Sequence, residues 1–542
     1  MPNSTPNFTA EVLAQLDHAL QQRQIAQGIR LLRKSWKRLE VTGTDHAQDA
    51  ALALAIAQWV DVGYRDHAAL ETVLSHFPAE QRARMPVREY LLVRMAEAFH
   101  SLLLEDADTA IDLLDFVVKA EKELGDLGLT ALAHFWKGRS HRKKGEYESA
   151  LLHISEARRR AEQMGALRMV AVIEIQEGWL VFQKGEPRRA LQIFDHAQQQ
   201  LRDTDDAIAL GNIESARGRI VRRAGEYQEA LEHYDRAIAY YHSRDPNHRN
   251  LARALVNSAY VKRLMAFHLR KRIDTKRKSG ARGGPKRELV RSYNVRYAAM
   301  CRDALAQLDR AGEIYRLHHQ HGGAGTVLVN AGQLHLDMGA IDDAAAESAK
   351  AYAWGEEKHD HILMARARIL EAMAENARVD EQLGEDADIA VYANAAKRYA
   401  EEAVKLAGLT QNQRLLAGAY IARGMTAAND FFEQWDEANQ AATDAAALLR
   451  SDDRDHLWEE LVELKSRILR ASGIDETLRS WSEGIIGEKT FQQISEEFAQ
   501  IVIPKVWARE GKKVARVAEK LSISPKKVRR ILRSVDLMEQ GD

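Results

Sequence analysis

The stretch AHFWKGRSHRKKGEYESALLHISEARRRAEQ, residues 133–163, decides the fold of this chain. Its apolar residues recur at helical spacing on both sides of Gly145. Glycine readily adopts the backbone of a tight turn, so the stretch predicts two antiparallel helices joined at Gly145. Gly138 and Ala150 are small, and we expect them to lie where the two helices approach each other most closely.

The same pattern of small residues returns every 40 positions. Gly138, Gly178 and Gly218 each precede one alanine by 12 residues and a second by 19 residues. A second glycine follows each of them at a constant distance. The residues concerned are Ala150, Ala157, Ala190, Ala197, Ala230 and Ala237, with the second glycines Gly145, Gly185 and Gly225. Such self-similarity is typical of stacked helical units that cannot bury their apolar faces alone.

Weaker copies of the pattern extend it in both directions. They comprise Ala98, Ala110 and Val117, then Gly332, Gly339, Ala344 and Ala351, and finally Gly424, Trp435, Ala438 and Ala445. We interpret residues 8–97 and 361–406 as further helical hairpins. The copy at Gly424 has two extra residues in its turn. An ordinary helical bundle with coincidental glycines is the alternative, and the other five copies of one spaced pattern argue against it.

The repeated unit resembles the tetratricopeptide (TPR) repeat, lengthened from about 34 residues. The resemblance rests on residues 133–163 and on the two later copies, LVFQKGEPRRALQIFDHA and RIVRRAGEYQEALEHYDRA. In the second copy Pro187 replaces a tyrosine, at a position suited to the first turn of a helix. The resemblance implies an all-α fold, a TPR-like α-solenoid over residues 8–472 with repeats of 40 residues.

Composition agrees with an all-α chain. Only 9 prolines occur in 542 residues, and no run alternates apolar and polar residues over the length of a strand. The sequence has neither a signal peptide at its start nor an apolar stretch long enough to span a membrane. Its single cysteine, Cys301, excludes an intrachain disulfide and predicts a reducing cytoplasm.

The resemblance to TPR repeats also implies a concave groove. Residues one and four or five positions after the first glycine of each unit face that groove, and here most are basic. Such a groove suits an acidic or carboxylate-bearing peptide or a nucleic-acid backbone, whereas pairing with neighbouring glutamates is the alternative. The predicted groove residues, including an apolar wall and three amides, are Arg139, Arg142, Lys143, Trp179, Phe182, Asn212, Arg219, Arg222, Arg223, Asn257, Lys262, Arg263 and Asn330.

The net charge is −1, but two windows concentrate basic charge. Residues 270–291 hold ten Lys and Arg against two acidic residues, and residues 505–533 hold eleven against two. The first window contains Gly280, Gly283, Gly284 and Pro285, which predict an exposed, basic inserted loop over residues 269–290. It either contacts nucleic acid or is a solvated run of charge. The candidate contacts are Arg270, Lys271, Arg272, Lys276, Arg277 and Lys278.

The second window belongs to a predicted C-terminal domain, residues 489–536, that follows a linker over residues 473–488. The segment TFQQISEEFAQIVIPKVWARE predicts one helix, and KKVARVAEKLSISPKKVRRILRSV predicts two short ones. The turn falls at residues 522–524, and Pro525 opens the last helix. We expect Val514, Val517, Ala518 and Leu521 to face inward, together with Val528, Ile531 and Leu532. This spacing is typical of a helix-turn-helix.

The stretch REGKKVARVAEKLSISPKKVRRILRS resembles the C-terminal DNA-binding module of the Fis family. The resemblance implies a homodimer that binds DNA, with residues 491–507 as the pairing helix. Ser522 stands where the family usually has glycine, Pro504 interrupts the pairing helix, and no ATPase domain precedes the module. A basic helix that contacts protein is the alternative. The predicted DNA-binding residues are Lys512, Lys513, Arg516, Ser524, Lys526, Lys527, Arg529, Arg530 and Arg533.

The sequence contains no recognisable catalytic motif. GARGGPK lacks the spacing of a phosphate-binding loop, and Cys301 has no recognisable histidine partner. The histidines at 318, 319, 321, 359 and 361 lack the arrangement of common metal sites. We therefore expect no catalytic residues, no metal and no cofactor.

Two functional interpretations remain. The favoured one is a bacterial-type DNA-binding transcriptional regulator whose TPR superhelix senses a peptide, protein or small-molecule signal. The alternative is a TPR scaffold that recruits a protein partner to nucleic acid, for example in genome maintenance or anti-phage defence. The expected partners are DNA and a protein or peptide in the groove, and the scaffold interpretation extends the nucleic acid to RNA. Neither interpretation involves a membrane.

Overall fold

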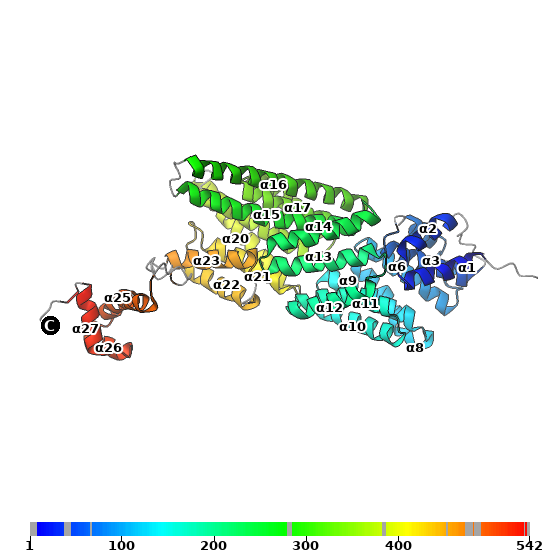
Figure 1. Ribbon diagram of the computed structural model, residues 1–542, viewed down its shortest axis with the longest axis horizontal. Helices are drawn as coiled ribbons and strands as arrows, with labels where there is room; N and C mark the ends of the chain where they lie inside the picture. Colours follow the sequence, from blue (N-terminus) through cyan, green and yellow to red (C-terminus); the bar gives the residue numbers. More distant parts are fainter. Residues whose placement is uncertain are drawn as a thin grey trace, which may run out of the picture. The chain divides into compact units, whose positions relative to one another are not determined.

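The computed structural model describes residues 8–36, 45–64, 68–278, 284–381, 386–450, 454–471, 481, 489–535 and 537–538. Throughout these residues the regular elements are helices, and none is a strand, which confirms the expected all-α class. The chain divides after Val462 into two compact units (Figure 1).

The first unit is a succession of helices, most of them paired as antiparallel hairpins with their neighbours in sequence. The N-terminal part contains α1 (Phe8–Gln21), α2 (Ile25–Ser35), α3 (His46–Asp61), α4 (Ala68–Ser75), α5 (Ala79–Arg82), α6 (Val87–Leu103), α7 (Ala107–Lys119) and α8 (Glu121–Leu124). The three clear repeats form α9 (Leu127–Lys144), α10 (Tyr147–Gln163), α11 (Leu167–Gln183), α12 (Pro187–Leu201), α13 (Ala207–Arg223) and α14 (Tyr227–Arg244).

The second half of this unit continues the same arrangement. Its helices are α15 (Arg249–Lys278), α16 (Gly284–Leu317), α17 (His321–Met338), α18 (Ile341–Glu357), α19 (His361–Asp380), α20 (Asp386–Gly408), α21 (Gln413–Ala427) and α22 (Trp435–Leu448). Helix α23 (His456–Ala471) crosses the division between the two units.

The first glycine of each repeat lies where two helices meet. A Cβ atom added there would lie too close to a buried side chain of the paired helix: 2.8 Å from Ile154 at Gly138, 2.7 Å from Phe194 at Gly178 and 2.9 Å from Tyr234 at Gly218. These three partners are fully buried and follow each other at 40 residues. The expected close approach is therefore confirmed, and the large partner explains why the smallest residue stands opposite it.

The second glycine ends the first helix of each hairpin. Gly145 has φ of +80° and caps α9 in the left-handed conformation, which costs a side-chain-bearing residue more than glycine. The same geometry recurs at Gly185 and Gly225, with φ of +82° and +87°. The turns predicted from the spacing thus have the conformation that selects glycine.

The core extends along the solenoid as successive clusters rather than as one centre. The alanines of the weaker copies and Val117 are all fully buried, namely Ala98, Ala110, Val117, Ala344, Ala351, Ala438 and Ala445. Burial of these positions between stacked hairpins is what a repeat architecture requires.

The basic window at residues 269–290 differs from the predicted loop. Residues 269–278 continue α15, and α16 already begins at Gly284, with Pro285 in its favoured first turn. Leu269 and Ile273 are buried, so apolar contacts extend the helix beyond the solenoid's usual hairpin length while the charges remain on its other faces. The predicted loop was wrong for these two helix ends, and Gly280 and Gly283 lie outside the described residues.

The second unit contains α25 (Phe491–Arg509), α26 (Val514–Lys520) and α27 (Pro525–Ser534). Ile503, Val517, Ala518, Val528, Ile531 and Leu532 form its core, with Val514 and Leu521 partly buried against it. Pro504 is accommodated within α25. The linker predicted over residues 473–488 lies outside the described residues except for position 481.

Candidate functional site

A concave pocket of about 1220 Å³ opens in the first unit. Its wall includes the first helices of successive hairpins, α9, α11, α13 and α15, together with residues of α1, α3 and α6. Six predicted groove residues line it: Arg139, Arg142, Lys143, Trp179, Asn212 and Arg219. The spacing rule of the repeats therefore brings residues from three hairpins to one surface.

Among the described residues, nine arginines and lysines line this pocket, and we name the six that lie on α9, α13 and α15 the groove cluster: Arg139, Arg142, Lys143, Arg219, Arg249 and Arg253. Asp61 of α3 lies among them. Its carboxylate accepts hydrogen bonds from Arg139 at 2.6 Å, from Arg249 at 3.2 Å and from the indole of Trp136 at 3.2 Å. Burial alone would raise the pKa of Asp61, but the two arginines outweigh it and lower that pKa.

The other cations of the groove cluster repel one another. Desolvation, followed by Arg253, Arg139 and Arg219, lowers the pKa of Arg142 to about 9. Desolvation also lowers the pKa of Arg219 to about 10, with contributions from Arg253 and Arg222. Each guanidinium still carries its charge at neutral pH, so the pocket concentrates positive charge in a poorly solvated space.

Lys143 is the cation of the cluster that titrates nearest to neutrality. The side chain of Lys143 is exposed to solvent. Its ammonium lines the groove and donates a hydrogen bond to the backbone carbonyl of Leu102 at 3.1 Å. Desolvation lowers its pKa to about 8, and Glu105 opposes this shift while Arg249 and Arg139 add to it. A negatively charged ligand would reverse that shift.

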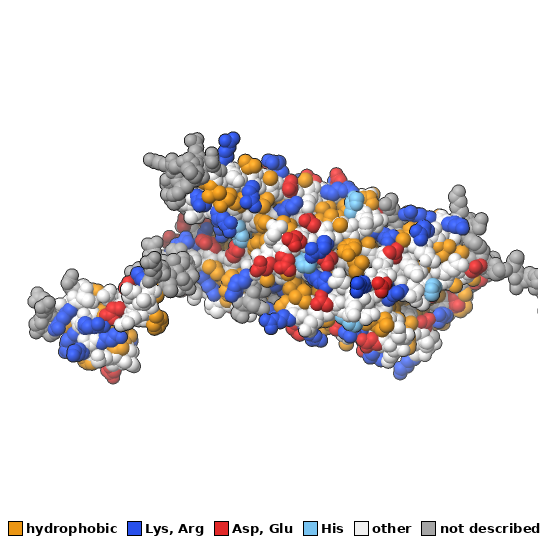
Figure 2. Space-filling model, viewed as in Figure 1, with side chains coloured by type: hydrophobic (Ala, Val, Ile, Leu, Met, Phe, Trp, Pro, Cys, Tyr) orange, Lys and Arg blue, Asp and Glu red, His pale blue; other side chains and the backbone are white. Residues whose placement is uncertain are grey.

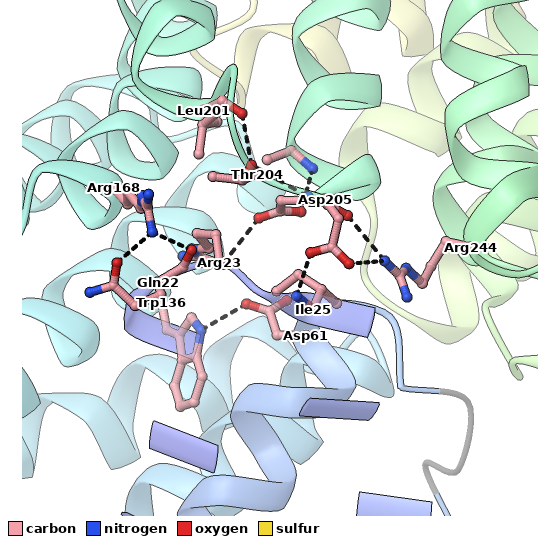
Figure 3. A network of polar contacts seen from close by, with 12 residues as sticks. Gln22, Arg23, Ile25, Asp61, Trp136, Arg168, Leu201, Thr204, Asp205 and Arg244 are labelled. Carbon is pink, nitrogen blue, oxygen red and sulfur yellow. Dashed lines mark hydrogen bonds and ion pairs between the residues drawn. The ribbon is translucent and has the colours of Figure 1, made fainter. Parts of the chain in front are cut away.

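A network of polar contacts joins distant parts of the sequence beside the pocket residues Arg23 and Asp61 (Figure 3). The Asp205 carboxylate accepts hydrogen bonds from the backbone N–H groups of Ile25 and Ala26, both at 2.6 Å. Arg23 pairs with Asp206 at 3.3 Å beside it. A carboxylate at the start of α2 complements the helix dipole, so the loop between α12 and α13 holds the N-terminal hairpin in place.

Three predicted groove residues contribute to the packing of the solenoid. Arg263 is 3% exposed and forms a two-point ion pair with Asp337 at 2.6 and 3.2 Å. Asn330 is also buried and donates to the carbonyl of Thr326 in its own helix. Phe182 lies in the core beneath Arg223, whose guanidinium carbon is 3.9 Å from the ring centroid. These positions were wrongly expected to face a ligand, because charge and spacing alone do not reveal a buried partner.

Four other predicted groove residues lie outside the pocket wall, and one of them is Arg223, which covers the ring of Phe182. The guanidinium of Arg222 lies 4.8 Å from the ring centroid of Tyr260, and Lys262 is 3.9 Å from Asp303. The amide nitrogen of Asn257 is buried, and no described residue accepts a hydrogen bond from it.

Sequence reasoning missed Asp61, Arg249 and Arg253. The last two lie on α15 at four-residue steps before Asn257, on one face of the helix. That step was a usable signal, because side chains four residues apart share a helix face. Nothing in the sequence connects Asp61 to residues about 80 and 190 positions later, since long-range stacking alone brings them together.

The second basic surface belongs to α26, α27 and the residues before them. We name it the recognition surface, and all its predicted members are exposed: Lys512, Lys513, Arg516, Ser524, Lys526, Lys527, Arg529, Arg530 and Arg533. Figure 2 shows Lys and Arg side chains gathered on the visible face of this unit. The surface surrounds a small apolar core, as the sequence pattern predicts.

Local backbone features fix this surface. Ser522 has φ of +54°, so the turn adopts the conformation for which glycine would be preferred. The Ser524 hydroxyl accepts a hydrogen bond from the N–H of Lys527 at 3.2 Å and caps α27. Ser524 is therefore engaged as a cap. Arg530 pairs with Glu496 of α25 at 2.6 Å.

The basic end of α15 is a third charged region. Arg270 lies 3.4 Å from Asp274, and Lys271 lies 4.5 Å from the ring centroid of Phe267. Arg272 is exposed and Lys276 is partly buried, whereas the side chains of Arg277 and Lys278 lie outside the described residues. Asp274 and the ring of Phe267 therefore contact two of the cations that were expected to bind nucleic acid.

In the portion of the chain that the structure describes, no group of His, Cys, Asp and Glu is arranged to hold a metal ion. Over the same residues, helices long and apolar enough to cross a membrane are absent.

Comparison with known proteins identifies a fold for this chain but does not identify a family. No family model matches the chain, and no curated protein matches its sequence. A Rap protein complexed with Competence and Sporulation Factor shares 13% identity with a TM-score of 0.51, covering 74% of this chain and 99% of Rap. The Rap likeness shows a TPR-like α-solenoid and confirms the expected fold.

Two other solved structures match with lower TM-scores. The apo quorum sensor NprR from B. thuringiensis shares 15% identity, with a TM-score of 0.38, covering 81% of this chain and 98% of NprR. A human IFIT1 dimer with PPP-AAAA shares 10% identity, with a TM-score of 0.42, covering 82% of this chain and 95% of IFIT1.

Proposed function

We propose that the protein is a DNA-binding transcriptional regulator in which the TPR-like solenoid senses a signal and the C-terminal unit binds DNA. The recognition surface carries this proposal: nine candidate side chains are exposed around a three-helix core of helix-turn-helix spacing. In a helix-turn-helix the start of the second helix meets base edges, while neighbouring cations meet phosphates.

The positions on α27 fit these two roles. Lys526 and Lys527 occupy the first turn, which the Ser524 cap and Pro525 hold in place. Arg530 lies one turn further, and its ion pair with Glu496 would be exchanged for a contact with DNA. Lys512, Lys513 and Arg516 lie before and within α26 and supply the proposed phosphate contacts.

Homodimer formation is part of the proposal. Helix α25, which the resemblance assigns to pairing, exposes Phe491 by 86% and Phe498 by 50%. Large aromatic side chains open to solvent on one short helix favour burial against a partner. A second copy of α25 would provide that burial.

The groove is the proposed sensor. The Rap protein that shares this fold is complexed with Competence and Sporulation Factor, and the pocket of this chain provides a concave, charged surface of its own. Ligand binding there would alter DNA affinity through the difference in ligand affinity between the two states of the regulator.

The test is DNA binding by full-length protein, measured by fluorescence anisotropy with a random-sequence duplex at low salt. K527A/R530A should bind about 10-fold or more weakly, because each contact to DNA contributes on the order of 1–3 kcal/mol. The matched control K122A/K350A removes two exposed lysines from the solenoid and should bind like the wild type. Equal affinity of K527A/R530A and the wild type would exclude the proposed surface.

A further inference from the structure

The groove cluster has too few carboxylates for its charge. Among the described residues, Asp61 is the one carboxylate within ion-pair distance of any of the six cations, and it contacts two of them. Arg142 and Arg219 have no such partner there. A pocket with uncompensated guanidinium groups is arranged for an anion that arrives from outside.

Beside the groove cluster, several hydrogen-bond acceptors are already occupied, whereas several donors are not. The Asn212 side-chain oxygen already accepts from the Tyr241 hydroxyl at 2.8 Å and from the Asn250 amide at 3.1 Å. The Asn250 oxygen accepts from Arg253 at 2.8 Å, and a Glu105 carboxylate oxygen accepts from the N–H of Gly322 at 2.7 Å. These acceptors are therefore engaged within the protein.

Donors, in contrast, remain available. Within the described chain, Nε of Arg142 and Nε1 of Trp179 are buried without a hydrogen-bond partner, and the guanidinium of Arg142 lies 5.0 Å from the Trp179 ring centroid. The amide nitrogen of Asn212 adds further donors to the same wall. A ligand that fits the wall formed by Arg142, Trp179 and Asn212 therefore supplies more acceptors than donors.

We propose that this pocket binds a small molecule carrying two or more phosphate groups, such as a nucleoside polyphosphate. The inference names the class of signal for the proposed regulator and rests on the proposal that its groove is the sensor. Ionised phosphate oxygens only accept hydrogen bonds, and guanidinium groups bind them in two-point geometry.

An acidic peptide fits the same wall less well. Its carboxylates carry one charge each, and those on one side of an extended chain lie about 7 Å apart. Its backbone also brings N–H donors, which need acceptors that Asn212 and Asn250 have already committed. A polyphosphate concentrates several charges within a few bonds and brings no donor of that kind.

The remaining volume indicates an organic portion. The pocket of about 1220 Å³ is larger than phosphate groups require, and Leu132, Phe135 and Val172 line it besides the cations. Ligand pockets commonly combine such apolar walls with a few polar groups that fix orientation. The charged end of the ligand would lie against the groove cluster and the organic end against these side chains.

The test uses full-length protein without DNA, in isothermal titration calorimetry with ATP and with inorganic triphosphate, in buffer containing EDTA. Both probes should bind the wild type, and R142Q/R219Q should weaken them about 30-fold or more, because two charge-assisted contacts are lost. The control R159Q/R189Q removes two exposed arginines, paired with Glu156 and Glu186, and should bind normally. Circular dichroism melting confirms that each variant is folded.

Three results would overturn the inference: no binding of either probe by the wild type at millimolar concentration, unchanged affinity in R142Q/R219Q, or tighter binding of a polyglutamate peptide or single-stranded oligonucleotide at the same residues. Binding of triphosphate that depends on Arg142 and Arg219 supports it even if K527A/R530A leaves DNA affinity unchanged. In that case the pocket stands and the regulator proposal fails.

Discussion

The groove cluster and the recognition surface are both cationic, but the protein holds their charges differently. In the groove, desolvation and mutual repulsion lower the pKa of Arg142, Arg219 and Lys143. On α26 and α27 the cations are exposed around a small apolar core. A concave cluster selects a compact, multiply charged anion, whereas an exposed surface suits an extended polyanion that releases counterions.

The largest expected difference between the two regions is in salt dependence. Raising salt from about 50 to about 200 mM should weaken DNA binding by about 1000-fold if most of the recognition surface meets phosphates. Triphosphate binding should weaken only about 10-fold, because the groove is less open to screening ions. Anisotropy and calorimetry over the same salt series measure both, and parallel losses would contradict the distinction.

The second expectation is that variants separate the two activities. R142Q/R219Q should lose about 30-fold in triphosphate affinity through the loss of two charge-assisted contacts while retaining DNA affinity. K527A/R530A should show the reverse, with a loss of about 10-fold or more in DNA affinity and unchanged triphosphate affinity. A variant that impairs both activities while its melting curve is unchanged would show that the regions are not separate sites.

The third expectation concerns pH and Lys143. Because the pKa of Lys143 is about 8, its positive charge is lost as the pH rises from 7 to 9, and triphosphate affinity should fall several-fold. Calorimetry measures this decrease. K143M should remove the part of the decrease that begins near pH 8. Glu105, Arg249, Arg139 and Arg142 face the ammonium, and Arg142, with a pKa of about 9, extends the fall to higher pH.

The same shift fixes the sign of the effect on stability. The pKa of Lys143 is about 8 in the folded chain and about 10.5 in the unfolded chain, so the unfolded chain binds this proton more tightly. Lys143 therefore destabilises the folded state below pH 8, and this destabilisation decreases as the pH rises toward about 10.5. Without ligand, K143M should be more stable than the wild type at pH 7, and the difference should shrink at higher pH. A constant difference between chemical unfolding curves at the two pH values would contradict the assignment.

The smallest expected effect is on thermal stability without ligand. R219Q should raise the melting temperature by about 1 °C, because it removes a desolvated charge that Arg253 and Arg222 repel. R159Q, on the exposed face of α10, should leave it unchanged. Differential scanning calorimetry resolves shifts of this size, and a clear decrease for R219Q would show that this arginine stabilises the fold.

The repeated pattern made the solenoid predictable because each unit obeys local rules. Gly138 and Gly178 pack against Ile154 and Phe194 through the same contact, so one spacing specified the three clear hairpins. The glycines and charges of residues 269–290 led to the prediction of a loop. Ile273, which is buried and keeps α15 helical, was not recognised as a core residue. Tertiary packing outweighed local propensity there.

The site was only partly predictable for a related reason. Arg139, Arg142 and Arg219 follow from the repeat register, whereas Asp61 and Arg249 come from other registers and meet only through stacking. Arg263 obeyed the register and yet pairs with Asp337, since a sequence does not show which cations find a carboxylate. Periodicity therefore predicts which face a residue occupies, and long-range contacts decide what it does there.

The most direct test of the account is coupling between the two regions. DNA affinity of the full-length protein is measured with and without saturating triphosphate at fixed ionic strength. The account predicts a change of about 5-fold or more that disappears in R142Q/R219Q. An identical DNA affinity under both conditions, with triphosphate shown to be bound, would contradict the claim that the groove is the sensor of a DNA-binding regulator.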